Sequence, residues 1–128
     1  MMQGLSLSET IIIPQHLKTS EVRAYLNQTA IRDVRDPATP TPTAADEYGR
    51  SSQIFVLEAV VRKGGAERRA MARGRDIYAV AAPIVAEAAE RLVNGGAKKT
   101  GVLAAGEAFE PRDFLTSLSP EHLRFEIG

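Results

Sequence analysis

The sequence predicts an α+β fold: a small antiparallel or mixed sheet with a β-hairpin at about 54–73, covered on one face by a long helix at about 76–93. Three features lead to this prediction. Residues 54–62 form an apolar, β-branched run of the kind found in strands. Two glycines follow at the centre of a tight turn. Beyond them, apolar residues recur at helical spacing.

The first fifty residues predict short elements and a loop. Residues 1–8 are expected to fray, and the β-branched run at 9–13 predicts a short strand that Pro14 ends. Residues 19–26 predict a short helix, because a Thr-Ser pair at its start is suited to cap it. The segment at about 35–50 is rich in Pro and Thr and is expected to be an exposed loop. The alternative for this segment is a Pro-rich ligand for a recognition domain.

The hairpin prediction rests on Gly64 and Gly65, because glycine accepts the positive φ angles of primed turns. With these glycines as the loop, Arg62 lies opposite Glu67 as a favourable cross-strand charge pair. One face of the hairpin is expected to receive the long helix and consists of Leu57, Ala59, Val61, Ala70 and Ala72. The opposite face carries an apolar strip made of Ile54, Val56 and Val60. Because the helix cannot cover this strip, we expect a homodimer or a higher oligomer to use it.

The long helix is predicted from an apolar stripe that ends at Leu92. Asp76 is suited to cap its first turn, and the run Asn94-Gly95-Gly96 supplies a stop. Pro83 lies inside this stretch and is expected to kink the helix. The alternative is a short first turn followed by a main helix that starts near Pro83.

The C-terminal part predicts two further elements. Pro111 suits the first position of a short helix, whose inner face is expected to hold Phe114, Leu115 and Leu118. Residues 123–127 alternate as a final strand. We expect residues 1–128 to form a single α+β domain, because a chain of this length normally makes one domain.

The composition argues against several classes of partner. Lys and Arg balance Asp and Glu at 16 each, so no net charge attracts nucleic acid or an anionic membrane. The apolar runs are too short to cross a bilayer, and no secretory leader is recognised. The sequence has no cysteine, which excludes disulfides and thiol chemistry. A cytoplasmic protein without membrane or nucleic-acid partners is expected.

The sequence offers few candidates for chemistry. Arg50, Arg75 and Tyr78 are the candidate substrate-binding residues, since they could hold an anion, but no base or nucleophile is paired with them. No catalytic residue is assigned. No G-x-G-x-x-G loop is present, so no cofactor-binding residue is assigned either. His16 and His122 lack companions at ligand spacing, and no metal site is expected.

Several ordered motifs in the second half of the chain resemble a known family. They are Gly74-Arg75-Asp76-Ile77-Tyr78, Ala82-Pro83-Ile84-Val85-Ala86-Glu87-Ala88, Gly101-Val102-Leu103, Gly106-Glu107-Ala108-Phe109 and Arg112-Asp113-Phe114-Leu115. Together they resemble the C-terminal part of saccharopine dehydrogenase-like oxidoreductases, from about Glu9 onward. The chain departs from that pattern at Ala81, where a hydroxyl residue is expected, which puts a polar role at that helix turn in doubt.

The resemblance implies a function that the residues alone do not. Members of the family pair a Rossmann domain for NAD(P) with a mixed α+β domain that shapes the substrate side and often the dimer contact. This sequence resembles only the second part. We therefore expect a substrate-side and dimerisation domain without activity alone, with NAD(P) bound only if a Rossmann domain or subunit is supplied. The alternative is a free-standing homodimeric interaction module with no reaction.

Overall fold

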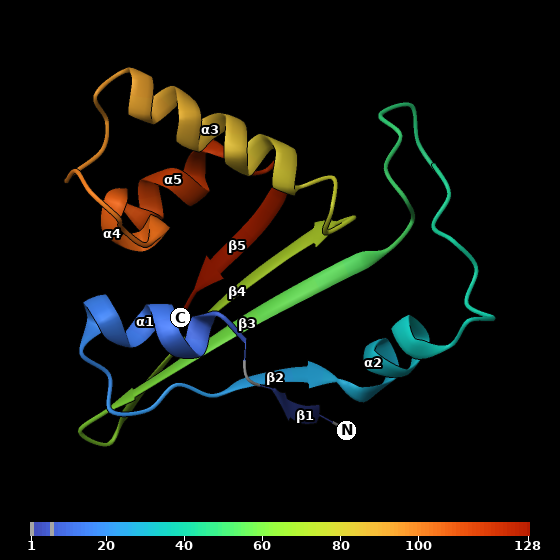
Figure 1. Ribbon diagram of the computed structural model, residues 1–128, viewed down its shortest axis with the longest axis horizontal. Coiled ribbons are helices and arrows are strands. Elements are labelled where there is room, and N and C mark those ends of the chain that lie inside the picture. Colours follow the sequence, from blue (N-terminus) through green and yellow to red (C-terminus); the bar gives the residue numbers. More distant parts are fainter. Residues whose placement is uncertain (1, 6) are drawn as a thin grey trace. The chain divides into compact units, whose positions relative to one another are not determined.

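The structure, a computed structural model, describes residues 2–5 and 7–128 and confirms the α+β class (Figure 1). Its contacts divide the chain into two compact units, each of which is described by itself. The first unit comprises Met1–Thr41 with Lys99–Ala108, and the second comprises Pro42–Lys98 with Phe109–Gly128. The single domain expected from the sequence stays a prediction.

The first unit combines a two-stranded sheet with short helices. Strand β1 (Met2–Leu5) pairs antiparallel with β2 (Ala24–Asn27). The helices of its described part are α1 (Glu9–Leu17), α2 (Gln28–Arg35) and α4 (Ala105–Ala108). In the described part of this unit, no apolar side chain is buried.

Three predictions for the first unit are wrong. Residues 2–5 form a strand and do not fray, whereas Met1 and Ser6 lie outside the described residues. The run at 9–13 belongs to helix α1, and the segment 19–26 contains the start of β2 and no helix. Local propensities differ by less than about 0.7 kcal/mol per residue, so pairing between distant segments overrides them. Here β2 pairs with β1, and Asn27 then caps α2 by accepting from the Thr29 amide at 2.9 Å.

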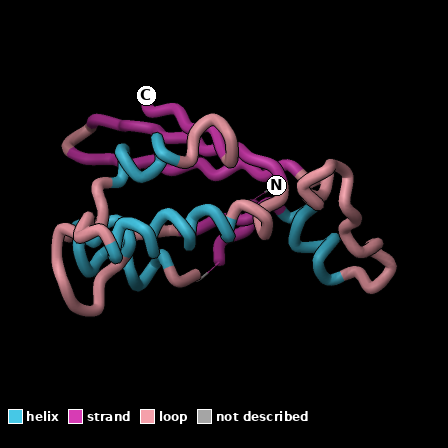
Figure 2. The backbone as a smooth tube through the Cα atoms, turned by 90° about the horizontal axis from the view of Figure 1, so that it is seen from above, coloured by secondary structure: helices cyan, strands magenta, loops and turns pink. Residues whose placement is uncertain are grey.

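The second unit is built on a three-stranded antiparallel sheet in the order β3-β4-β5 (Figure 1, Figure 2). Its strands are β3 (Ile54–Lys63), β4 (Ala66–Arg75) and β5 (Leu123–Ile127), so the expected final strand is confirmed. The hairpin is also confirmed: Gly64 and Gly65 have φ angles of 55° and 82°. Arg62 lies opposite Glu67 as expected, and its Nε donates to the Glu67 Oε2 at 2.7 Å.

The long helix begins later than the sequence predicts. Helix α3 spans Ala81–Val93, and residues 77–80 form a turn before it. Pro83 therefore lies in the first turn of the helix, where the backbone amides have no intrahelical acceptor to lose. The prediction of a kinked helix that starts at Asp76 is wrong. The alternative, a short turn followed by a main helix near Pro83, is correct.

The core of the second unit lies at one end of the sheet. Helix α5 (Pro111–Ser117) begins with proline at its first position, as expected. The buried cluster consists of Val80, Leu118 and Leu123, and the partly buried side chains packed against it are Phe55, Ile84, Phe114, Leu115 and Phe125. The start of α3, helix α5 and strand β5 therefore meet over the end of the sheet that carries Phe55, and the inner face predicted for α5 is confirmed.

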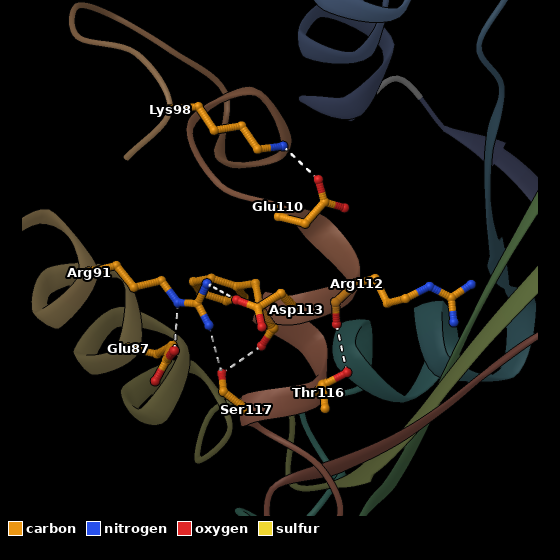
Figure 3. Close-up of polar contacts among 9 residues, drawn as sticks. Glu87, Arg91, Lys98, Glu110, Arg112, Asp113, Thr116 and Ser117 are labelled. Atoms are coloured by element: carbon orange, nitrogen blue, oxygen red, sulfur yellow. Dashed lines mark hydrogen bonds and ion pairs between the residues drawn. The ribbon is translucent and has the colours of Figure 1, made fainter. Parts of the chain in front are cut away.

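The expected packing of the long helix along the hairpin is wrong at its centre. Leu57 is 58% exposed and Val61 is 61% exposed, so neither lies under the helix. The reason is that α3 turns its polar face toward α5 (Figure 3). Arg91 of α3 donates to the Asp113 carboxylate of α5 at 2.6 Å. Its guanidinium also lies over the Phe114 ring of α5, 5.1 Å from the ring centroid.

The contrast between Leu118 and Leu57 gives a test of where the core lies. Leu118 is 2% exposed, so Leu118→Ala should destabilise the fold by about 2–5 kcal/mol through lost burial and a cavity. Leu57→Ala, the matched control, should change the free energy of unfolding by less than about 0.5 kcal/mol. Urea unfolding followed by circular dichroism measures both. Equal losses in the two variants would contradict this description of the core.

Candidate functional site

The structure brings two of the three candidate substrate-binding residues together. Arg50 Nε donates to the Asp46 Oδ2 at 2.7 Å, and an Arg75 terminal nitrogen lies 3.6 Å from the same oxygen. Tyr78 is 81% exposed, and its hydroxyl makes no hydrogen bond with the described part of the chain. The candidate site therefore contains two guanidinium groups that share one carboxylate, with Tyr78 outside this contact.

Asp46 organises the loop that carries Arg50. Its Oδ1 accepts from the Tyr48 amide at 3.0 Å and from the Arg50 amide at 2.9 Å. Gly49 closes this turn with a φ of 74°, a conformation that favours glycine. The Arg50 guanidinium lies 5.0 Å from the centre of the Tyr48 ring. Burial tends to raise the pKa of Asp46, but the hydrogen bonds from Arg50 outweigh it and lower that pKa below its usual value.

Asp76 ties the same loop to the end of β4. Its Oδ2 accepts from the Ser51 amide at 2.8 Å, and its Oδ1 accepts from the amides of Tyr78 and Ala79 at 3.1 and 3.0 Å. Arg75 Nε donates to the Ser51 carbonyl at 2.8 Å. The hydrogen bonds from Ser51 and then Ala79 lower the pKa of Asp76. We call this group of residues the loop clamp: Asp46, Arg50, Ser51, Arg75 and Asp76.

The loop clamp is suited to hold structure and offers little for a reaction. A general base must reach a substrate proton with a free lone pair. In the clamp, the carboxylate oxygens of Asp46 and Asp76 already accept from backbone amides and arginines. The charges of Arg50 and Arg75 are offset by Asp46, which weakens any attraction for an anion. The sequence identified Asp76 as a residue suited to cap the following turn. The hydrogen bond from the Ser51 amide to Asp76 depends on the folded chain and could not be seen in the sequence.

A second polar cluster joins the two helices of the second unit and was not foreseen from the sequence (Figure 3). Arg91 donates to Glu87 at 2.6 Å, to Asp113 at 2.6 Å and to the Ser117 hydroxyl at 3.4 Å. The hydrogen bond from Arg91 lowers the pKa of Glu87. The spacing of Glu87 and Arg91 by four residues was visible in the sequence, whereas Asp113 is supplied by tertiary packing. We call these four residues the Arg91 link.

The open half of the core-side sheet face forms a shallow apolar groove of about 230 Å³. It is lined by Leu57, Glu58, Ala59, Ala70, Met71, Ala72, Leu115, Phe125 and Ile127. Almost all of its exposed lining is apolar. The groove is therefore suited to contact with another apolar surface.

The structure gives no sign of a metal centre or a membrane span within its described ranges. Residues 2–5 and 7–128 contain no group of three or more His, Cys, Asp or Glu side chains placed to hold a metal ion. No helix in the described part of the chain is long and apolar enough to cross a membrane.

Comparison with known proteins identifies no family for this chain. No protein-family model, no curated protein and no solved structure matches the chain. The resemblance to saccharopine dehydrogenase-like oxidoreductases therefore stays a prediction that rests on its sequence motifs.

The lowered pKa of Asp76 predicts a pH-dependent role in stability. Because the folded pKa lies below the unfolded one, the charged carboxylate stabilises the fold at neutral pH, and this contribution is lost as pH falls through the folded pKa. Asp76→Asn should therefore lower the melting temperature near pH 7. The gap from the natural protein should begin to shrink below about pH 4, the ordinary pKa of an aspartate in the unfolded chain, and should be lost as pH falls through the lower pKa of the folded state.

Thermal unfolding at a series of pH values measures this gap. Asp33→Asn is the matched control, because Asp33 is exposed and makes no side-chain hydrogen bond with other described residues. A gap for Asp76→Asn that stays constant from neutral to acid pH would show that the charge of Asp76 does not act as described.

Proposed function

We propose that this chain is an association domain: the substrate-side and dimerisation part of a saccharopine dehydrogenase-like oxidoreductase, located in the cytoplasm and without activity alone. The observation that carries the proposal is the exposure of large apolar side chains on both faces of the sheet in the second unit. Ile54 and Val56 on one face, and Leu57 and Val61 on the other, are each more than half exposed. Contiguous apolar surface of this kind usually marks a contact site.

A partner that covers either face of this sheet would remove its exposed apolar side chains from water, which favours association.

The family resemblance makes the proposal more specific. In such an enzyme the cofactor NAD(P) is bound by a Rossmann domain or subunit, and the present chain would contribute the wall of the substrate site and the subunit contact. The geometry of the loop clamp fits a positioning role of this kind, because its groups are occupied by one another and none is placed as an acid, base or nucleophile.

A free-standing homodimeric interaction module is the second candidate. The sheet face that carries Ile54 and Val56 favours it, since this face holds charges of both signs beside its apolar residues. A surface with that composition can be complementary to itself in a twofold dimer. This candidate needs a second copy of the chain and no Rossmann partner.

Both candidates predict self-association. Sedimentation equilibrium of the purified chain at micromolar concentration should give the mass of a dimer or a higher oligomer. A monomer mass throughout the accessible concentration range would contradict both candidates.

We expect the chain alone to bind no NAD(P), and this expectation distinguishes the proposed domain from an enzyme that is active by itself. Titration with NADPH, followed by calorimetry, should show no saturable binding at low micromolar concentration, because the sequence contains no G-x-G-x-x-G turn for the pyrophosphate. Size-exclusion chromatography of the chain with an added Rossmann-domain polypeptide of the resembled family separates the two candidates. Co-elution of the two polypeptides supports the oxidoreductase domain, and saturable NADPH binding by the chain alone would contradict the proposal.

A further inference from the structure

We propose that the outer face of the sheet in the second unit binds a second copy of this chain, face to face and with antiparallel strands, so that Arg124 of each copy meets Glu126 of the other. This inference rests on the proposed self-association and names its surface and register. The outer face is the side opposite Phe55, Leu123 and Phe125. Its side chains are Ile54, Val56, Glu58, Val60, Arg62, Glu67, Arg69, Met71, Arg73, Arg75, Arg124 and Glu126.

The strand register places the charges of this face in two neighbouring rows. In the first row, Val56, Arg73 and Arg124 lie side by side across β3, β4 and β5. In the next row, Glu58, Met71 and Glu126 lie side by side. The rows are two residues apart along the strands, which is a separation of roughly 7 Å. One row is thus doubly positive, and its neighbour is doubly negative.

The positive row lacks compensation within the chain. Arg73 and Arg124 are directly opposite each other on adjacent strands, an arrangement of like charges that destabilises a sheet. Neither arginine, nor Glu126, makes an ion pair within 4.0 Å with another residue in the described part of the chain. By contrast, Arg69 on the same face is bound by Glu58 and Glu67 at 2.7 and 2.8 Å. The uncompensated charges therefore form a small group with both signs.

A twofold axis between the two rows pairs two members of this group, Arg124 and Glu126, across the interface. If the axis lies in the plane between two facing sheets and runs across their strands, each positive row faces the negative row of the other copy. Arg124 then meets Glu126 twice, as an isologous contact requires. Exposed apolar side chains on the same face, which include Ile54, Val56 and Met71, would supply the buried area, while the charges set the register.

The pattern of uncompensated charges on the face favours a second copy over a polyanion, because Arg124 and Glu126 have opposite signs and lie in adjacent rows. A polyanion would approach the arginines past the carboxylates of Glu58, Glu67 and Glu126, which repel it. A second copy uses charges of both signs. An acidic partner remains an outcome that the experiment distinguishes.

Charge reversal tests the register. Arg124→Glu and Glu126→Arg each place like charges in contact, so each variant alone should raise the dimer dissociation constant by roughly tenfold or more in sedimentation equilibrium. An equal mixture of the two variants should recover association as a heterodimer, and the double variant should recover it as a homodimer. Arg68→Glu is the matched control, because it makes the same charge change on the opposite face and should leave the dissociation constant unchanged.

Each outcome decides between the claims. Dimers of the single variants as stable as those of the natural chain would overturn this register while leaving the proposed self-association in place. Weakened single variants without recovery in the mixture would also overturn it. If the natural chain stays monomeric, the proposed function is contradicted as well. If the natural chain binds poly-glutamate through Arg73, the face is assigned to an acidic partner instead of a second copy. If a reversal prevents folding, Arg124→Gln and Glu126→Gln replace it, with weaker association expected for both.

Discussion

The second unit depends on one small buried cluster, because very few apolar side chains are buried in the described part of the chain. Among the described residues the buried apolar set is Val80, Phe109, Leu118 and Leu123. Val80, Leu118 and Leu123 form one cluster that fixes the start of α3, the end of α5 and the first residue of β5. Fully burying one such side chain contributes about 1.5–3 kcal/mol, and ordering each residue costs about 1–2 kcal/mol. A core of this size leaves large apolar side chains of the sheet exposed, and the proposed association with another chain would bury them.

Polar contacts hold other segments of the second unit in place. The loop clamp fixes the irregular segment before β3 onto the end of β4 through Asp76 and Ser51. The Arg91 link joins α3 to α5 beside the cluster. Exposed ion pairs alone contribute little to stability, but backbone amides that donate to a carboxylate fix the chain in one geometry. The groups most suited to chemistry by type are therefore used to position backbone, which agrees with an association domain.

The sequence predicted local structure well where periodicity and turn chemistry agreed. The glycine pair fixed the hairpin and its register, and Pro111 marked the start of α5. It failed at residues 19–26, where pairing of β1 with β2 overrides propensity, and at residues 9–13, which form part of helix α1. It also placed α3 along the hairpin, since the contact of Arg91 with Asp113 across 22 positions has no sequence signal. At the candidate site, Arg50 and Arg75 were identified, whereas the carboxylate of Asp46 that they share depends on the folded loop.

The central claim is that association with a second copy completes the burial of this sheet. The most direct test is the dependence of the thermal unfolding midpoint on protein concentration, because only a folded state that is an oligomer is stabilised by mass action. Over a hundredfold range of concentration, the account predicts a midpoint that rises steadily with concentration. A midpoint that stays the same over that range would contradict it.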